Sequence, residues 1–140
     1  MPQGMYMRTM RIASAINASV ELSEAKRCVD ENGYCWWGTG KNASIAHEII
    51  VRTQGDSKLF HGIMEVSGLI NAENISQSDF ISNRPKNSAN FPSEKRQTQY
   101  YKITSITLEK IPREKVLYAE TERTLTANQL HANTRVILES

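Results

Sequence analysis

Two adjacent tryptophans lie in segment 34–42, YCWWGTGKN, and the chain contains no others. Indole is the best side chain for stacking on a flat π-system or on a cation. Gly38 and Gly40 let a ligand come close to the backbone, and Lys41 adds a positive charge. The segment therefore suits a flat, polar or anionic ligand such as a nucleotide.

The two indoles are expected to divide structural and binding roles. Successive side chains of an extended segment face opposite ways, so one indole packs while the other lines a pocket. We expect Trp37 to border the pocket, because Gly38 beside it leaves room for a ring, and Trp36 to be the core residue. The competing interpretation is that both tryptophans are core residues. The expected packing partners of Trp36 form a helical stripe: Leu22, Ala25 and Val29.

Positive charge is concentrated in one part of the chain. The net charge is only +2, but residues 81–102 hold five basic residues and one acidic residue. Such a segment is either a solvated loop or a phosphate-binding surface. The candidate phosphate-binding residues are Lys41, Arg84, Lys86, Lys95 and Arg96.

Sequence motifs of catalysis are missing. The chain has no HExxH, no P-loop and no serine-centred nucleophile elbow. Two cysteines do not make a four-ligand metal signature, and the histidines lie far apart, His61 being the most interesting of them. We therefore expect no enzymatic activity, no metal and no cofactor.

The N-terminus lacks the apolar core of a signal peptide, and no apolar run approaches the roughly 18 residues that span a bilayer. These features predict a cytoplasmic protein that does not enter a membrane.

The length of 140 residues is that of one domain. Residues 1–9 are expected to be a loose tail, and residues 10–140 a single α+β domain. Its curved or barrel-like mixed sheet would have about six strands, flanked by two or three helices. The helix after the first strand is expected to have Ser19 as its N-cap and to end at Gly33. The expected strands are 11–16, 48–53, 58–70, 100–108, 115–119 and 135–138.

Three local features refine this prediction. Residues 48–70 predict a hairpin, in which Gly62 marks a bulge or a close backbone approach. A change of apolar phase predicts a second bulge near residues 104–105. Residues 71–98 are polar and are expected to form an irregular connection, which in a compact domain is functional or mobile.

Four stretches of the chain resemble the EVE and YTH branches of the PUA-like superfamily. They are the opening strand and turn 11–17, the segment WGTGKN at 37–42, the hairpin around FHGIMEVS at 60–67, and QYYKI at 99–103 leading into Ile111-Pro112. Together they extend over nearly all of residues 10–138.

The resemblance implies a small barrel-like sheet that binds RNA or DNA and holds a flipped, methylated base in an aromatic cage. Trp37 would be the first wall, Phe80 would stand where YTH domains place a second tryptophan, and both would lie near Asn17. Asn17 would contact the base edge, with Thr39 at the small hydroxyl position and Gly38 beside the ring. The basic residues named above would contact phosphates, and a separate effector protein is a possible partner.

An alternative from another class is a small-molecule-binding or hydrolytic domain on the same scaffold, as in the related ASCH domains. It would need Lys41, His61 and a carboxylate to converge around the tryptophan pocket. Placement of His61 away from Trp37 would remove the best candidate for that chemistry.

Overall fold

The structure is a computed structural model that describes residues 9–39, 45–85, 94–95 and 97–139. Its described part has an α+β fold with one eight-stranded sheet and two α-helices. In chain order the strands and helices are β1 Thr9–Ala15, α1 Ala18–Asn32, β2 Cys35–Thr39, β3 Glu48–Thr53, β4 Leu59–Asn71, α2 Gln77–Ser82, β5 Gln99–Pro112, β6 Val116–Tyr118, β7 Arg123–Thr124 and β8 Arg135–Leu138. Within the described residues, three short 3-10 turns lie at residues 72–74, 113–115 and 127–129.

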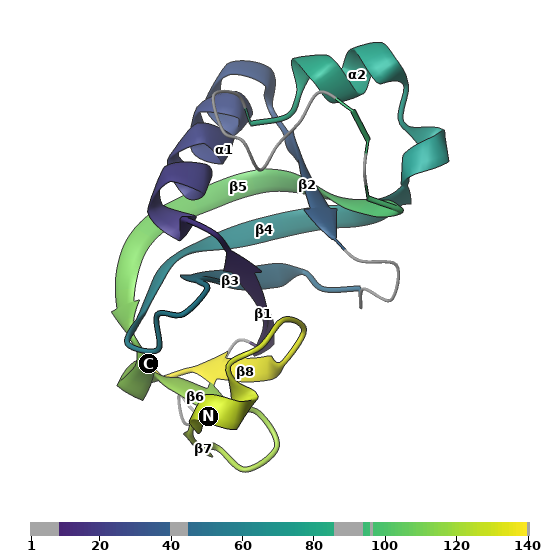
Figure 1. The fold of residues 1–140 in the computed structure, drawn as a ribbon. Helices are drawn as coiled ribbons and strands as arrows, with labels where there is room; N and C mark the ends of the chain where they lie inside the picture. The colour runs from purple at the N-terminus through teal and green to yellow at the C-terminus, as the bar shows by residue number, and fades with distance from the viewer. Residues whose placement is uncertain (1–8, 40–44, 86–93, 96, 140) are drawn as a thin grey trace, which may run out of the picture.

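The sheet is mostly antiparallel and its strand order is β2-β5-β4-β3-β1-β8-β6-β7. The only parallel pair in the described part is β1 with β3. Because β2 and β7 stand at its two ends, the sheet is open, and the closed barrel expected from the resemblance is not established. Figure 1 shows the long strands β4 and β5 curving below α1, with β6, β7 and β8 at the opposite end of the molecule from both helices.

Helix α1 is capped at both ends by residues next to it in the chain. The Asn17 side chain accepts a hydrogen bond from the Val20 N–H, while the Glu21 carboxylate accepts one from the Asn17 N–H, which forms a reciprocal cap. Asn17, and not the expected Ser19, is therefore the N-cap. The helix ends at Gly33, which has a φ of 91°, and this left-handed conformation carries little steric cost in glycine.

Three apolar clusters hold the sheet. The first lies between α1 and the sheet and includes Leu22, Ala25, Ile49, Met64 and Ile103. The second lies on the opposite side of the strands and includes Ile12, Ile50, Phe60, Val116 and Val136. The third and smallest joins β2 and β5 to α2, through Trp36, Ile75, Phe80 and Tyr100.

Most local predictions are confirmed. The hairpin of β3 and β4 is present, Glu48–Thr53 and Arg135–Leu138 have the predicted bounds, and the ladder between β4 and β5 skips Thr104. The register also shifts next to Gly62, where an added Cβ would lie 2.7 Å from the Thr107 carbonyl oxygen. The prediction for residues 71–98 was wrong in part, because α2 forms there and gives Phe80 a regular element.

The predicted strand number was also too low, because the short strand β7 and the β2 segment were not counted. None of the helices in the described ranges is long and apolar enough to cross a membrane.

Candidate functional site

A cavity of about 310 Å³ opens beside Trp37. Strands β1, β2, β3 and β5 and two loop segments contribute to its wall. The lining residues are Arg11, Ile12, Ala13, Ser14, Trp37, Gly38, Thr39, Ile49, Gln97, Tyr101, Ala132 and Asn133. This volume is at the lower end of the range of roughly 300–1,000 Å³ that is usual for small-molecule sites.

The curvature of the sheet brings the walls of this cavity together. Strands β2 and β1 are separated by β5, β4 and β3 in the strand order, yet residues of both line the same cavity. Trp37 lies directly opposite Tyr101 in the ladder between β2 and β5. Both residues belong to the apolar cluster under α1, so the cavity lies on the helix-bearing side of the sheet.

The cavity wall includes polar side chains and carries a single kind of charge. Burial raises the pKa of Tyr101 above its ordinary value, while the Thr39 hydrogen bond and the charge of Arg11 oppose this rise. Tyr101 is therefore a neutral hydroxyl at physiological pH. Among the described lining residues Arg11 is the only charged one, and none is a carboxylate.

Trp36 faces the other way and is held by α2. Its indole Nε1 donates a hydrogen bond of 3.2 Å to Asp79 Oδ1, which also accepts from the Tyr34 hydroxyl at 2.7 Å and the Asn83 amide at 2.7 Å. The Tyr34 ring stands edge-on to the indole at 5.6 Å between centroids. The Asp79 carboxylate thus joins α2 to β2 and to Tyr34, which lies between α1 and β2.

These surroundings correct the predicted packing of the two indoles. Trp37, not Trp36, packs in the cluster that contains the α1 stripe, and Trp36 packs with Phe80 and Tyr100. The prediction inverted the two faces because it placed α1 on the wrong side of β2. Both indoles are nearly buried, at 5% exposure for Trp36 and 6% for Trp37, so Trp37 borders the cavity while also serving as a core residue.

Three of the five proposed base-binding residues come together. Trp37, Gly38 and Thr39 line the cavity. Phe80 does not, because it is buried against Tyr100 with ring centroids 5.1 Å apart on the opposite side of β2. Asn17 is also outside the lining, and its side chain caps α1.

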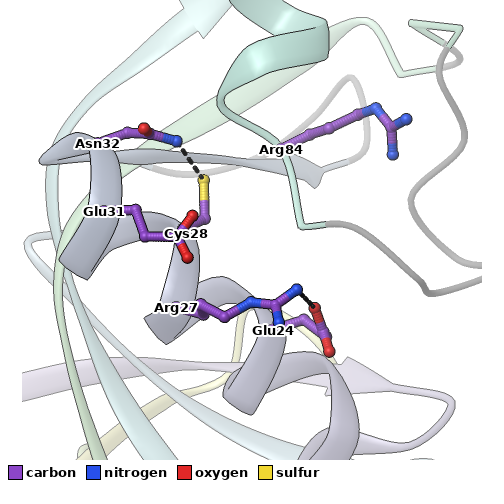
Figure 2. Close-up of a pocket in the computed structure, with 6 residues that line it drawn as sticks. All are labelled: Glu24, Arg27, Cys28, Glu31, Asn32 and Arg84. Atoms are coloured by element: carbon purple, nitrogen blue, oxygen red, sulfur yellow. Dashed lines mark hydrogen bonds and ion pairs between the residues drawn. The ribbon is translucent and has the colours of Figure 1, made fainter.

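The proposed phosphate-binding residues do not gather at this cavity. Arg84 donates to its neighbour's carbonyl at Pro85 and lines a separate small pocket beside the C-terminal half of α1, its guanidinium pointing away from Cys28 and Asn32 (Figure 2). The Lys95 ammonium donates to the carbonyl oxygens of Ala72 and Ile75, which secures the turn before α2. The other three, Lys41, Lys86 and Arg96, lie outside the described residues.

His61 lies apart from Trp37. It lines another hollow with Ser19, Ser23, Leu108, Glu109 and Lys110, and its Nε2 lies 3.9 Å from Asp56 Oδ2. Its placement removes the best candidate for a hydrolytic trio at the tryptophan cavity. Within the described ranges, no group of three or more His, Cys, Asp or Glu side chains is arranged to hold a metal ion.

The sequence analysis missed the other cavity residues, among them Arg11, Gln97, Tyr101 and Asn133. Tyr101 carried a usable signal, because two successive tyrosines on a strand must face opposite sides, as two successive tryptophans do. Arg11, Gln97 and Asn133 carried none. Arg11 and Asn133 meet at the β1–β8 pair, and only the curvature of the sheet brings them to the same cavity as Gln97 and β2.

Comparison of the chain with models of protein families, with curated proteins and with solved structures gives no match. The resemblance to the PUA-like superfamily therefore stays a prediction.

Proposed function

We propose that this domain binds nucleic acid without catalysing a reaction, and that it holds a flipped, methylated base in the cavity beside Trp37. The observation that supports this most directly is the placement of Trp37, Gly38 and Thr39 together on the wall of a cavity of about 310 Å³. A flipped base needs a surface for stacking and polar groups that read its edge.

The cavity offers both kinds of contact. The aromatic residues Trp37 and Tyr101 line it, and the Thr39 hydroxyl and the Gln97 amide supply donors and acceptors. Base extrusion costs a few kcal/mol, and stacking on an aromatic side chain returns roughly 1–3 kcal/mol per base. Tyr101 replaces Phe80 in our proposal as the second aromatic residue, because Phe80 lies on the other side of β2.

The proposal extends to family and partners. A PUA-like domain of the EVE or YTH type would bind RNA or DNA, and a separate effector protein would act on the bound nucleic acid. Lys41, Lys86 and Arg96 remain proposed phosphate contacts along the strand that carries the base. Basic side chains that neutralise backbone phosphates release counterions, so the affinity should fall as the salt concentration rises.

A panel of oligonucleotides tests the proposal. Single- and double-stranded RNA and DNA, each with one methylated or plain base, would be titrated at low and high salt with intrinsic fluorescence as the readout. We expect the methylated member to bind most tightly and higher salt to weaken its binding. Equal or absent binding across the panel would contradict modified-base recognition.

Two conservative variants show which tryptophan gives the fluorescence change on binding. In Trp36→Phe the remaining indole is Trp37, and its fluorescence should respond to the oligonucleotide. In Trp37→Phe the remaining indole is Trp36, which is turned toward α2 and should stay silent. Free methylated nucleosides belong in the same titration, because preference for them over oligonucleotides would support the small-molecule alternative.

A further inference from the structure

Two arginines stand directly opposite each other on neighbouring strands, and one of them, Arg11, lines the Trp37 cavity. Arg11 of β1 and Arg135 of β8 are partners in the antiparallel ladder between these strands. Directly opposed side chains of such a pair lie on the same face, with Cβ atoms about 4.5–5.5 Å apart, and like charges at this spacing are destabilising. Their chain neighbours Ile12 and Val136 belong to the apolar cluster of the other face, so both arginines face away from that core.

The charge of this pair is not balanced within the described part of the chain. The ion pairs that form there join other residues, and neither Arg11 nor Arg135 takes part in one. The cavity wall that includes Arg11 also holds no described carboxylate. Two like charges on directly opposed residues repel each other, and an anion bound between them would relieve this repulsion.

The position of Arg11 is fixed by the turn that precedes β8. Its Nη1 donates a hydrogen bond of 2.9 Å to the Asn133 carbonyl oxygen. The same turn is tied to β1 by the Asn133 N–H, which donates to the Ile12 carbonyl oxygen at 2.8 Å, and by the Ile12 N–H, which donates to Thr134. A guanidinium has five N–H donors, so this arrangement orients Arg11 and leaves most of its donors for a ligand.

We propose that Arg11 and Arg135 form a phosphate-binding subsite at the edge of the Trp37 cavity. Planar guanidinium groups match the geometry of phosphate oxygens and bind them in bidentate fashion. In the context of the proposed function, on which this part of the inference rests, the subsite takes the phosphate next to the flipped base. Arg11 lines the cavity itself, while Arg135 adds charge from the neighbouring strand.

Inorganic phosphate tests the subsite without any assumption about a base. Thermal unfolding would be followed in phosphate and in chloride at equal ionic strength, for the wild type, Arg11→Gln, Arg135→Gln and the control Arg123→Gln, which removes an exposed arginine from β7. We expect phosphate to raise the Tm of the wild type and the control by several degrees, and to have little effect on the other two variants. Equal stabilisation of all four proteins would overturn the subsite.

The stability of Arg135→Gln relative to the wild type in chloride is a second test. Relief of like-charge repulsion should make Arg135→Gln more stable than the wild type at low salt, and phosphate should remove this difference. If the Tm of Arg135→Gln were lower than that of the wild type in both phosphate and chloride, Arg135 would have a structural role only. That result would contradict the subsite.

A chemically altered oligonucleotide then connects the subsite to the base. A neutral methylphosphonate would replace the phosphate on the 5′ side of the methylated base, and in a second oligonucleotide the one on the 3′ side. We expect at least one replacement to weaken wild-type binding about tenfold, the order of one charge-assisted hydrogen bond, and to change the binding of Arg11→Gln by less than about twofold. Loss of affinity to the same extent in both proteins would overturn the role of Arg11.

Failure of the two proposals can be told apart. Phosphate-dependent stabilisation without binding of any oligonucleotide or nucleotide would leave the subsite standing and remove the proposed function. If methylated oligonucleotides bound but neither inorganic phosphate nor the methylphosphonate replacements had an effect, the proposed function would stand and the subsite would be removed.

Discussion

The two tryptophans of β2 are chain neighbours with almost the same exposure, but they belong to different parts of the molecule. Trp36 packs with Phe80 and Tyr100 under α2, and its indole N–H is bound by Asp79. Trp37 packs in the cluster under α1 and at the same time borders the cavity. The comparison shows that burial alone does not distinguish the surroundings of the two indoles. The cavity beside Trp37 and the carboxylate beside Trp36 make the distinction.

The largest expected effect is the loss of either indole. Trp36→Ala and Trp37→Ala should each lower the free energy of unfolding by about 3–5 kcal/mol, because each removes a large buried side chain. Urea denaturation followed by circular dichroism measures both. A cost below about 1 kcal/mol for Trp37→Ala would mean that Trp37 is not part of the core and would restore the simpler division of roles.

Asp79 should be essential to the Trp36 region only. Asp79→Asn weakens three charge-assisted hydrogen bonds and should cost about 2 kcal/mol, while ligand binding at the Trp37 cavity stays unchanged. Denaturation measures the first effect and oligonucleotide titration the second. A matched control is Asp30→Asn, which removes an exposed carboxylate on α1 that is paired with Lys26. Loss of ligand binding in Asp79→Asn would show that the two regions are coupled.

The same carboxylate predicts a pH dependence. Burial raises the pKa of Asp79, but hydrogen bonds from Tyr34, Trp36 and Asn83 and the charge of Lys102 outweigh it, so the pKa lies below its ordinary value of 3.8. The folded state therefore binds this proton less readily than the unfolded state. The stability that Asp79 contributes is full above pH 3.8 and is lost as the pH falls through the lower, folded-state pKa. The free energy of unfolding should fall less steeply with decreasing pH in Asp79→Asn than in the wild type. An identical slope in the two proteins would contradict this role of Asp79.

Two glycines should respond differently to the same substitution. In Gly62→Ala the new Cβ would meet the Thr107 carbonyl oxygen at 2.7 Å, so the backbone must move, at a cost of about 1–3 kcal/mol. In Gly38→Ala it would meet the Gln97 Cγ at 2.7 Å and the Tyr100 ring at 3.2 Å, which are side-chain atoms and can shift without moving a strand. We expect Gly38→Ala to be the more stable variant and the one that weakens binding at the cavity. The reverse order in denaturation would contradict this.

The smallest effect concerns the thiols. Cys35 is fully buried on the Trp37 side of β2, and burial raises its pKa well above 9.0, whereas Cys28 lines a small surface pocket. A thiol reagent should therefore label Cys28 first and Cys35 only as the core opens. Ligand at the cavity should slow labelling of Cys35, with Cys28→Ser used to isolate its signal. Faster labelling of Cys35 than of Cys28 would contradict this order.

Local chemistry accounts for what the sequence analysis predicted well. The strand bounds of β3 and β8, the hairpin, the bulge near Thr104 and the helix end at Gly33 all depend on neighbours in the chain. Helix α2 was missed because its six residues have too short an apolar pattern to stand out from the polar segment around them. The helix is stabilised by contacts with a distant part of the chain: Asp79 accepts a hydrogen bond from Trp36, and Phe80 packs in the same cluster as Trp36.

By itself, the sequence determined that the tryptophans face opposite ways, because alternation along an extended chain is local geometry. Only the tertiary structure decided which of them meets α1, since that depends on the side of the sheet to which the helix crosses. The curvature of the sheet also brought Arg11 and Asn133, at the β1–β8 pair, to the cavity that Gln97 and Tyr101 line beside β2. Curvature is the sum of twist, bulges and packing over many strands, so no single segment of the sequence specifies it.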